Sequence, residues 1–539
     1  MSVTAAPQAP SHIVLCTLNA KYIHASLGLR YLLANMGALR AQTALREFTI
    51  ARKPQEVVNE LLGLNPRVIG FGVYIWNVTQ TCAVVRLLKQ QQPHIKIVLG
   101  GPEVSHEVQE QAATPQSIVY LADHVITGWG DVSFPKLCQA LLFGPQPLMK
   151  IIAGEQPPLD AITLPYGEYT DADLAHRVLY VEASRGCPFK CEFCLSSLDK
   201  TAWAFDLHRF LAELDTLYQR GARTFKFVDR TFNLKIDASI QILQFFLERL
   251  PAGGAPKAEQ LFVHFEVIPD HLPGKLKEKI AEFPPGVLQF EIGIQSFNVE
   301  VQQRISRRQD NLKTAANIAW LVEHSNAHLH TDLIFGLPGE SLQSFAEGFD
   351  RLYALKPHEI QLGILKRLRG TPIARHTVAH GMVYDAEPPY TVLQTHGVSS
   401  EDMQRFTRLA RYWDLIANSG RFAQTLAQLL SASNNSNSAF YAFLDLSDWL
   451  WRHTETTGHL TPEALVDALF DYLTSEAGIG AVQAREWLLA DYLKSGARAS
   501  PRALKDVLPR QALPLAKAPR QLATRQQRHE TAVATPSAA

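Results

Sequence analysis

The sequence has few cysteines, no excess of charge of either sign and no long apolar run. Only 6 cysteines occur among 539 residues, which argues against a disulfide framework and is typical of a reducing compartment. Lys+Arg and Asp+Glu both number 52, so overall charge does not indicate nucleic acid or a membrane surface as partner. No uninterrupted apolar run approaches the roughly 20 residues that span a bilayer, and the first ten residues lack the charged and apolar parts of a leader. We therefore expect a cytoplasmic protein without a membrane span.

Strands alternate with helices over the first 150 residues. Apolar runs predict the strands, and amphipathic runs between them predict the helices. The expected strands are residues 13–18, 68–75, 95–99, 118–121 and 124–127, and the expected helices are residues 28–36, 79–91 and 134–142. This order is typical of an α/β fold with a Rossmann-like parallel sheet covered on both faces, in which ligands bind beyond the carboxyl ends of the strands.

Polar and glycine-rich segments follow these strands, where a ligand would lie. They contain the candidate ligand-binding residues Asn19, Trp76, Asn77, Gly100, Gly101, Pro102, Gly128 and Gly130. Glycine turns let the backbone approach a large flat ligand, but they also serve as tight connections between a strand and a helix. The turns alone leave both interpretations open.

A second β/α series follows a proline-rich stretch. Residues 144–175 have little periodicity and are expected to form an extended linker between domains. The strands expected after it are residues 178–183, 225–228, 262–267, 290–294, 330–335 and 360–364, each separated from the next by a helical segment.

Three of the six cysteines lie within residues 187–194, CPFKCEFC, directly after the first strand of this second series. Thiolates at C-x3-C-x2-C spacing can hold three irons of a [4Fe-4S] cluster and leave the fourth iron open to a chelating ligand. A structural zinc site is disfavoured, because it needs four closed ligands and no second C-x2-C or H-x3-H pair follows. Cys16, Cys82 and Cys138 lie in apolar patterns and are expected in the core.

The cysteine loop resembles the signature of the radical S-adenosylmethionine (SAM) superfamily, whose fourth iron is chelated by the amino and carboxylate groups of SAM. The resemblance implies that the catalytic residues and iron ligands are Cys187, Cys191 and Cys194, and that Phe193 lies near the adenine. It also implies that the second series forms a partial (β/α)6 TIM-type barrel with its reactive groups at the carboxyl ends of the strands. An electron donor such as flavodoxin or ferredoxin is the implied protein partner.

Other segments of the second series match the SAM-binding positions of the superfamily in order. Residues 227–233, FVDRTFN, are similar to the D-x-x-F segment that contacts the methionyl amino group. Residues 291–296, EIGIQS, look like an E-x-G-x-Q-S strand, and residues 331–341, TDLIFGLPGES, match D-x-I-x-G-L-P-G-E-T. The cofactor-binding residues implied by these matches and by the downstream arginine of the family are Asp229, Thr231, Glu291, Gln295, Arg307, Gly336 and Gly339.

The N-terminal layout is similar to the cobalamin-binding domain that precedes the barrel in the cobalamin-dependent class of the superfamily. Those domains carry a GGP-type turn, here residues 100–102, and a GEGE-like turn, which reads GWGD at residues 128–131. The Asp-x-His-x-x-Gly motif that supplies a histidine to cobalt is missing, so the resemblance implies base-off cobalamin with no histidine on its lower face. His24 is expected to be a hydrogen-bonded structural residue rather than a ligand.

From Tyr390 onward the sequence has alanine- and leucine-rich helical periodicity. This part resembles an uncharacterised C-terminal domain found on a subgroup of these cobalamin-dependent enzymes. Trp449 and Trp451 are candidates for a substrate cavity, although aromatic residues at helical spacing are more often core. The polar, basic residues 508–539 are expected to be a disordered, solvated tail. The predicted segments are a Rossmann-like cobalamin-binding domain at 1–150, a linker at 151–175, a radical SAM partial barrel at 176–389, a helical C-terminal domain at 390–507 and the tail.

The function that these resemblances imply is that of a cobalamin-dependent radical SAM enzyme. It would cleave SAM reductively at a [4Fe-4S] cluster to form a 5'-deoxyadenosyl radical and would methylate an unactivated carbon. Two alternatives stay open, namely radical oxidation, cyclisation or rearrangement with the same cofactors, and a non-catalytic cofactor-binding sensor. The substrate cannot be identified from the sequence, and a small molecule is the default because no nucleic-acid or peptide-binding pattern is present.

Overall fold

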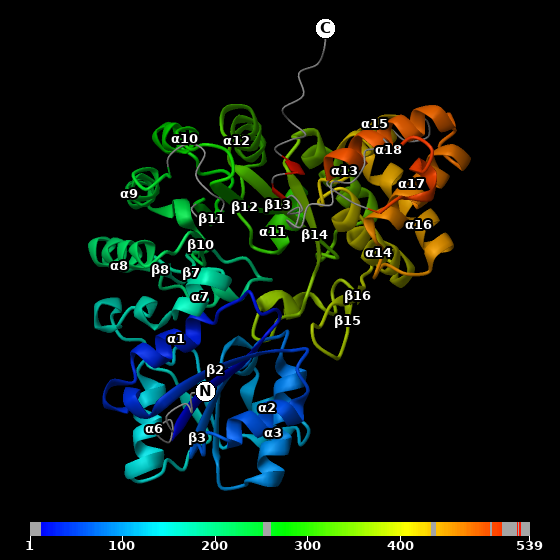
Figure 1. Ribbon diagram of the computed structural model, residues 1–539. Coiled ribbons are helices and arrows are strands. Elements are labelled where there is room, and N and C mark those ends of the chain that lie inside the picture. Colours follow the sequence, from blue (N-terminus) through cyan, green and yellow to red (C-terminus); the bar gives the residue numbers. More distant parts are fainter. Residues whose placement is uncertain are drawn as a thin grey trace, which may run out of the picture.

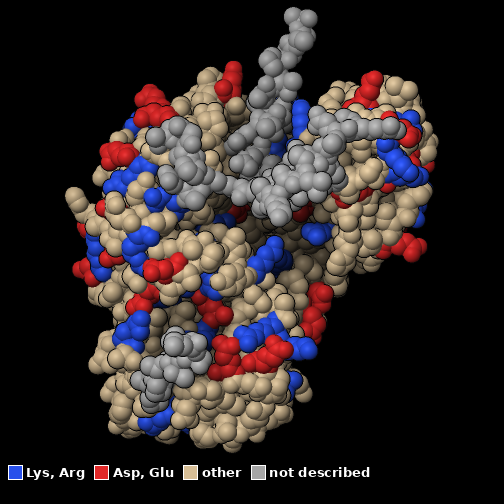
Figure 2. Space-filling view, viewed as in Figure 1, with Lys and Arg blue, Asp and Glu red and all other residues tan. Residues whose placement is uncertain are grey.

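The computed structural model describes residues 12–251, 260–432, 438–495, 499–508, 525–526 and 528–529. Figure 1 shows three parts: an α/β domain at the N-terminal end of the chain, a second α/β part above it and a group of helices beside the second part. Figure 2 shows acidic and basic side chains interspersed over the visible face, including the level at which the N-terminal domain meets the rest. Among the described residues, none of the helices is both long and apolar enough to cross a bilayer.

The N-terminal domain is a six-stranded parallel sheet in the order β2-β1-β3-β4-β5-β6. Its strands are β1 (Ile13–Asn19), β2 (Thr43–Thr49), β3 (Val68–Gly72), β4 (Lys96–Gly100), β5 (His124–Thr127) and β6 (Ile151–Ala153). Every residue of β1 is buried, because helices α1 (Leu27–Ala34) and α6 (Ser133–Phe143) cover one face of the sheet and α2 (Pro54–Leu62) and α3 (Val78–Gln91) cover the other. The strand order changes direction at β1, which opens a crevice beyond the carboxyl ends of β1 and β3.

Two expectations for this domain were wrong. Residues 118–121, expected as a strand, form the short helix α5 (Ile118–Leu121), because the Ser117 hydroxyl accepts a hydrogen bond from the Tyr120 amide and caps it. Residues 151–175, expected as a linker, contain β6, which pairs with β5, and the helix α7 (Asp171–His176). The prolines flank these elements rather than interrupting them.

The second sheet is also parallel, in the order β14-β13-β12-β11-β10-β7. Its strands are β7 (Leu179–Val181), β10 (Thr224–Phe227), β11 (Phe262–Val267), β12 (Leu288–Gln295), β13 (His328–Phe335) and β14 (Glu359–Ile364), and its main helices are α8 (Leu207–Gln219), α9 (Ile236–Leu247), α10 (Gly274–Ala281), α12 (Asn311–His324) and α13 (Leu342–Ala354). In the described part of the chain β7 and β14 do not pair with each other, so the six strands form the expected partial barrel. Along β12 the apolar side chains are buried while Glu291 and Gln295 alternate with them and are partly exposed on the inner face.

The C-terminal part consists of α14 (Ser400–Ile416), α15 (Ala423–Ala432), α16 (Ala439–Thr454), α17 (Pro462–Ser475) and α18 (Ala481–Ser495). It shares one apolar core with the barrel, and the Phe406 ring of α14 stacks on Phe335 of β13 at a centroid distance of 4.0 Å. Most of the predicted tail lies outside the described residues. Arg525 is described and forms ion pairs with Glu359 at 2.7 Å and Asp414 at 2.8 Å, so this arginine is not a solvated one.

A buried group of charges joins the N-terminal domain to α7. Arg30 of α1, 1% exposed, contacts Glu47 of β2 at 2.8 Å and Asp173 of α7 at 2.9 Å. Arg177 contacts the same Glu47 carboxylate at 2.7 Å. Removing one partner of such a group leaves uncompensated charge away from water.

We expect Arg30→Ala to lower the free energy of unfolding by about 3–5 kcal/mol, because Glu47 and Asp173 would stay buried without their cation. Urea titration followed by circular dichroism measures the change. Arg40→Ala is the matched control, since Arg40 pairs with Glu168 at 2.6 Å but is 45% exposed. This substitution should lower the free energy of unfolding by about 0–1 kcal/mol. Equal losses for the two variants would contradict the assignment.

Candidate active site

The three cysteines of the loop after β7 border one cavity of about 260 Å³ at the carboxyl ends of the barrel strands. Among the described residues, no three His, Cys, Asp or Glu side chains come together closely enough to hold a single metal ion. A cubane cluster keeps its thiolate ligands farther apart than a single ion does, so cysteines around a cavity suit a cluster. Other residues on the wall are Phe193, Arg230, Thr231, Glu266, Glu291, Gly293, Gln295, Arg307, Arg308 and Asp332.

The cysteine loop is held by its own backbone and by its neighbours. The Cys187 amide donates to the Asp199 carbonyl at 2.9 Å, and the Ser197 hydroxyl donates to the Cys191 and Cys194 carbonyls at 2.9 and 2.7 Å. Gly186 has φ +84° and packs so closely that a Cβ atom there would lie 2.6 Å from the Thr201 hydroxyl. These contacts hold the backbone that carries the three cysteines.

Burial raises the pKa of the Cys187 and Cys191 thiols above the usual value. Arg307 opposes this effect at Cys191, because its Nη1 atom lies 3.6 Å from the sulfur. The same guanidinium donates to the Gly293 carbonyl at the end of β12. Arg307 therefore joins the cysteine loop to β12 on the opposite wall.

A bulge in β12 aims Gln295 at the cavity. The pairing of β12 with β13 shifts register between Gly293 and Gln295, and Gln295 has φ +69°, which is unusual for a residue with a side chain. The Gln295 Oε1 atom and the Asp332 Oδ1 atom are both buried without a hydrogen-bond partner. Burial, with the Glu291 and Glu266 carboxylates nearby, raises the pKa of Asp332 well above its usual value. Unpaired polar atoms on a cavity wall fit a polar ligand such as SAM.

Glu291 is the ionised carboxylate of this wall. Burial alone would raise its pKa, but His264 at 3.1 Å and Lys226 at 3.6 Å lower the pKa to about 2. Both of these neighbours come from adjacent strands on the inner face of the barrel. Glu291 is therefore tied to the barrel interior while it also lines the cavity.

Some residues predicted to bind SAM lie off the wall. Asp229 is buried behind it, where it accepts hydrogen bonds from the Ala183 amide at 2.9 Å and the Ser184 hydroxyl at 2.6 Å; burial raises its pKa to about 7. A Cβ atom at Gly336 would meet Val392, so this glycine packs against the segment that follows the barrel. Likewise, Gly339 faces Arg304. Arg230 and Asp332 lie on the wall without having been predicted; both belong to the matched segments, Arg230 just after β10 and Asp332 within β13.

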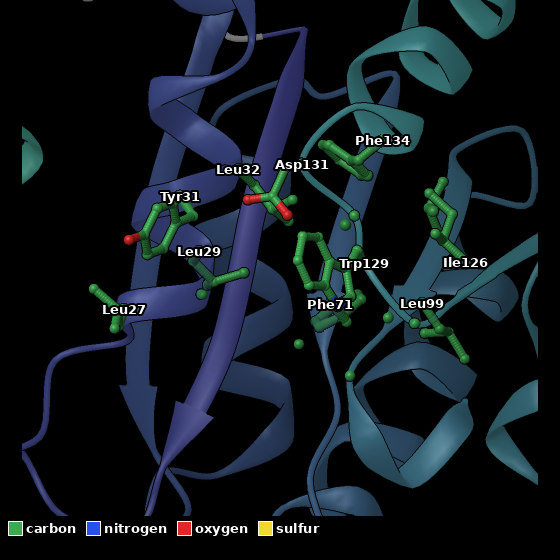
Figure 3. A pocket seen from close by; sticks show the side chains of 18 of the residues that line it. Leu27, Leu29, Tyr31, Leu32, Phe71, Leu99, Ile126, Trp129, Asp131 and Phe134 are labelled. Carbon is green, nitrogen blue, oxygen red and sulfur yellow. The ribbon is translucent and has the colours of Figure 1, made fainter. Parts of the chain in front are cut away.

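A second cavity, of about 320 Å³, lies in the N-terminal domain at the crevice beyond β3, β4 and β5. Gly100, Gly101, Gly128 and Gly130 line it as predicted. In Figure 3 the side chains of α1 border one side of this cavity, Leu99 and Ile126 border the other, and Trp129 lies between them. Gly101 has φ +107°, and a Cβ atom there would lie 2.5 Å from the Val73 carbonyl, so only glycine fits.

The other residues predicted for cobalamin surround this cavity without lining it. Asn77 is fully buried and donates to the Leu18 carbonyl at 3.0 Å and to Gly72 at 3.2 Å, which ties the ends of β1 and β3 together. Asn19 donates to Glu47 at 2.9 Å. Trp76, 48% exposed, stacks on Tyr74 at 4.4 Å beside the crevice. Pro102 starts the short 3-10 helix that follows Gly101, and His24 makes a structural hydrogen bond to the Tyr180 hydroxyl at 2.7 Å.

One short segment before the cysteine loop contributes residues to the walls of both cavities. Glu182 and Arg185 line the cavity of the N-terminal domain, and Cys187, two residues later, lines that of the barrel. Arg185 forms an ion pair with Asp131 at 2.8 Å, and Trp129 donates to Asp199 at 2.9 Å. The GWGD turn of the N-terminal domain is therefore docked on the loop that carries the cysteines.

Three family models match the chain in series. They are described as B12 binding domain, over residues 13–137, Radical SAM superfamily, over 181–352, and Protein of unknown function (DUF4080), over 378–537. Together they follow the three parts of the fold in order.

Two curated relatives and one solved structure illustrate the similarity. The 2-(S-pantetheinyl)-carbapenam-3-carboxylate methyltransferase of Streptantibioticus cattleyicolor is 24% identical over 55% of this chain and 46% of its own length. The cobalamin-dependent radical SAM methyltransferase TokK of Streptomyces tokunonensis is 25% identical over 56% of this chain and 47% of its own length. The chain thus spans about half the length of the curated relatives it matches. A structure of the cobalamin-dependent SAM radical enzyme OxsB with aqua-cobalamin matches with a TM-score of 0.60, 13% identity and coverage of 92% of this chain and 82% of that one, which shows the shared fold.

The site residues fit the groups that these domains imply. The cysteine-lined cavity with its unpaired Gln295 and Asp332 atoms suits a cluster with SAM, and the glycine-lined crevice, where Gly101 has no room for a side chain, suits a large flat ligand. The chain therefore combines a B12 binding domain with a radical SAM domain, as its similarity to cobalamin-dependent radical SAM enzymes also indicates, and these domains imply a [4Fe-4S] cluster, SAM and cobalamin as cofactors.

Proposed function

We propose that the chain is a methyltransferase that transfers a methyl group to an unactivated carbon of a small molecule. The observation that carries this proposal is that one short segment, from Glu182 to Cys187, contributes residues to the walls of both cavities. The names of the two curated relatives, both methyltransferases, support the reaction class.

When bound, the cluster and SAM supply a 5'-deoxyadenosyl radical, and cobalamin supplies the methyl group. The residues of this chain bind and orient these groups. Arg307 offers a cation to the SAM carboxylate beside Cys191. The buried oxygen atoms Asp332 Oδ1 and Gln295 Oε1 would hydrogen-bond to ribose hydroxyls. The apolar residues Phe193 and Val267 on the same wall limit the access of water.

The electron that starts the reaction comes from a protein such as flavodoxin or ferredoxin in this proposal. The substrate in this proposal is a small molecule, the default for a chain whose sequence has no nucleic-acid or peptide-binding pattern.

Anaerobic reconstitution with iron, sulfide and hydroxocobalamin tests the function directly. We expect about four irons per chain and stoichiometric cobalt. With SAM, a reductant and a candidate substrate, S-adenosylhomocysteine should form together with 5'-deoxyadenosine. Formation of 5'-deoxyadenosine alone would indicate a radical oxidation, cyclisation or rearrangement instead, and failure to cleave SAM at all would indicate a cofactor-binding sensor.

We expect Cys191→Ala to abolish reductive cleavage of SAM while cobalamin stays bound, because the cluster loses a thiolate and the N-terminal cavity is untouched. Iron content, cobalt content and 5'-deoxyadenosine formation measure the two effects separately. Cys82→Ala is the control, since Cys82 lies on α3 outside both cavities and should change none of the three. Retained SAM cleavage in Cys191→Ala would refute the cluster assignment.

A second, independent prediction concerns the Gly100–Gly101 turn. Gly101→Ala should weaken cobalamin binding by about tenfold or more, because its Cβ atom would push the turn away from Val73 and its φ is unfavourable for alanine. Cluster content should not change. Gly167→Ala is the matched control, because no atom lies within 4 Å of a Cβ at that position. Equal cobalamin affinity in Gly101→Ala, measured by equilibrium dialysis, would contradict the crevice assignment.

A further inference from the structure

The segment that follows β14, residues 366–376, contacts residues just after the Gly100–Gly101 turn, the cysteine loop, and a space beside the proposed SAM site. We call it the strap. It runs from the end of the barrel sheet into the 3-10 helix Pro372–His376. The structure brings three different sites against this one short segment.

One face of the strap lines a cavity on the SAM side. Lys366 and Leu368 border a space of about 250 Å³ beside the open edge of the barrel. This space shares Phe193, Gln295 and Asp332 with the cysteine-lined cavity, so the two are neighbours. The strap is therefore part of the wall next to the proposed SAM site.

The opposite face contacts the N-terminal domain directly after the Gly100–Gly101 turn. Arg369 pairs with Glu103 at 2.9 Å and with Glu107 at 3.1 Å, and Arg367 pairs with Glu107 at 3.0 Å. The Tyr390 hydroxyl donates to the same Glu103 carboxylate at 2.7 Å. Residues 366–369 thus alternate, with even positions toward the SAM side and odd positions toward the cobalamin-binding turn.

The end of the strap holds the cysteine loop. The Ile373 amide donates to the Glu192 carbonyl at 3.0 Å, and Arg375 Nε and His376 Nε2 lie 2.9 and 2.8 Å from the Glu192 carboxylate. Glu192 stands between Cys191 and Cys194 and is 3% exposed. The Ser306 hydroxyl completes its contacts at 2.6 Å.

We infer that the strap sets the distance and orientation between the cobalamin-binding turn and the cluster loop, with Arg369 and Arg375 as positioning residues. The inference rests on the proposed function for the identity of the two cofactors. Glu103 follows the glycine turn by two residues and its side chain is only 4% exposed, so the Arg369 contact fixes the turn rather than a free surface. Glu192 does the same for the cysteines. A rigid strap that holds both loops keeps the two reacting groups in register.

If the strap only held the two domains together, it would not need to contact both the cobalamin-binding turn and the cysteine loop. The domains are also joined by the Arg30 cluster and by the Arg185–Asp131 pair. Loss of the strap contacts should therefore leave the domains docked and change local geometry at the turn and at the loop. A glycine at position 370 supports the close fit, because a Cβ there would lie 2.4 Å from the His106 ring.

The test compares Arg369→Ala, Arg369→Lys and Arg375→Ala in the full chain. Pulsed electron paramagnetic resonance measures the distance between the reduced cluster and cob(II)alamin, and dilution measures the rate of cobalamin release. We expect a broader distance distribution and about 10- to 100-fold faster release in Arg369→Ala. Arg369→Lys should restore only part of the effect, because an ammonium cannot hold Glu103, Glu107 and Tyr390 at once. Arg375→Ala should broaden the distances without faster release.

Hydrogen exchange of the chain as purified adds a readout that needs no cofactor. Arg369→Ala should speed exchange in residues 101–108, and Arg375→Ala in residues 187–194. The matched control is Arg405→Ala, which removes a 2.7 Å pair with Asp448 in the C-terminal helices and should alter none of these measurements.

Unchanged exchange, distances and release in both alanine variants would overturn the inference while leaving the proposed function intact. A lower unfolding temperature with unchanged exchange at both loops would also overturn the inference, because the strap would then stabilise the fold without positioning the loops. Failure of the wild-type chain to bind cobalamin would refute the proposed function instead; exchange at the two loops would then still decide whether the strap holds them.

Discussion

Two parallel sheets meet with their carboxyl ends facing each other, and ion pairs at that boundary hold them there. Residues just beyond β5 and β4, Asp131 and Glu103, pair with Arg185 and Arg369, which lie just beyond β7 and β14. Parallel sheets collect their ligand-binding loops at this end, so facing ends bring the ligand loops of two domains together. A rotation of either sheet would separate them. Every later feature of the site, from the segment shared by the two cavity walls to the strap, depends on this arrangement.

Strong local patterns predicted most of the fold. Continuous apolar runs such as β1 and alternating runs such as β12 were sufficient to predict these strands. A strand buried on both faces is apolar throughout, whereas one buried on a single face is apolar at every second residue. The edge strand β2, TALREFT, was not predicted, since only its first and sixth residues are buried and its polar content masks the pattern. The three-residue β6 was hidden among prolines. Its pairing with β5 supplies stability that no property of residues 151–153 alone reveals.

The site was predictable where chemistry is local and not where it depends on distant neighbours. The cysteine spacing and the glycine turns are short-range signals, and the structure brings them to two adjoining cavities. The position of Asp229 behind the wall depends on Ala183 and Ser184, which are 46 and 45 residues away. The contacts of Arg369 with Glu103 and Glu107 join residues 266 and 262 apart. No sequence pattern specifies such a pair, because each residue taken alone looks like an ordinary solvent-exposed charge.

The polar inner wall of the barrel makes the fold less stable than an apolar wall would, and this supports its assignment as a binding site. Each buried polar atom without a partner, such as Gln295 Oε1 and Asp332 Oδ1, costs about 1–3 kcal/mol. The left-handed backbone of Gln295 adds a similar cost. Such costs persist only where the surrounding structure enforces them, here through the β12 bulge and the Arg307 contact with Gly293. A ligand that satisfies these atoms binds the folded chain alone, so its binding energy adds to the stability of the fold.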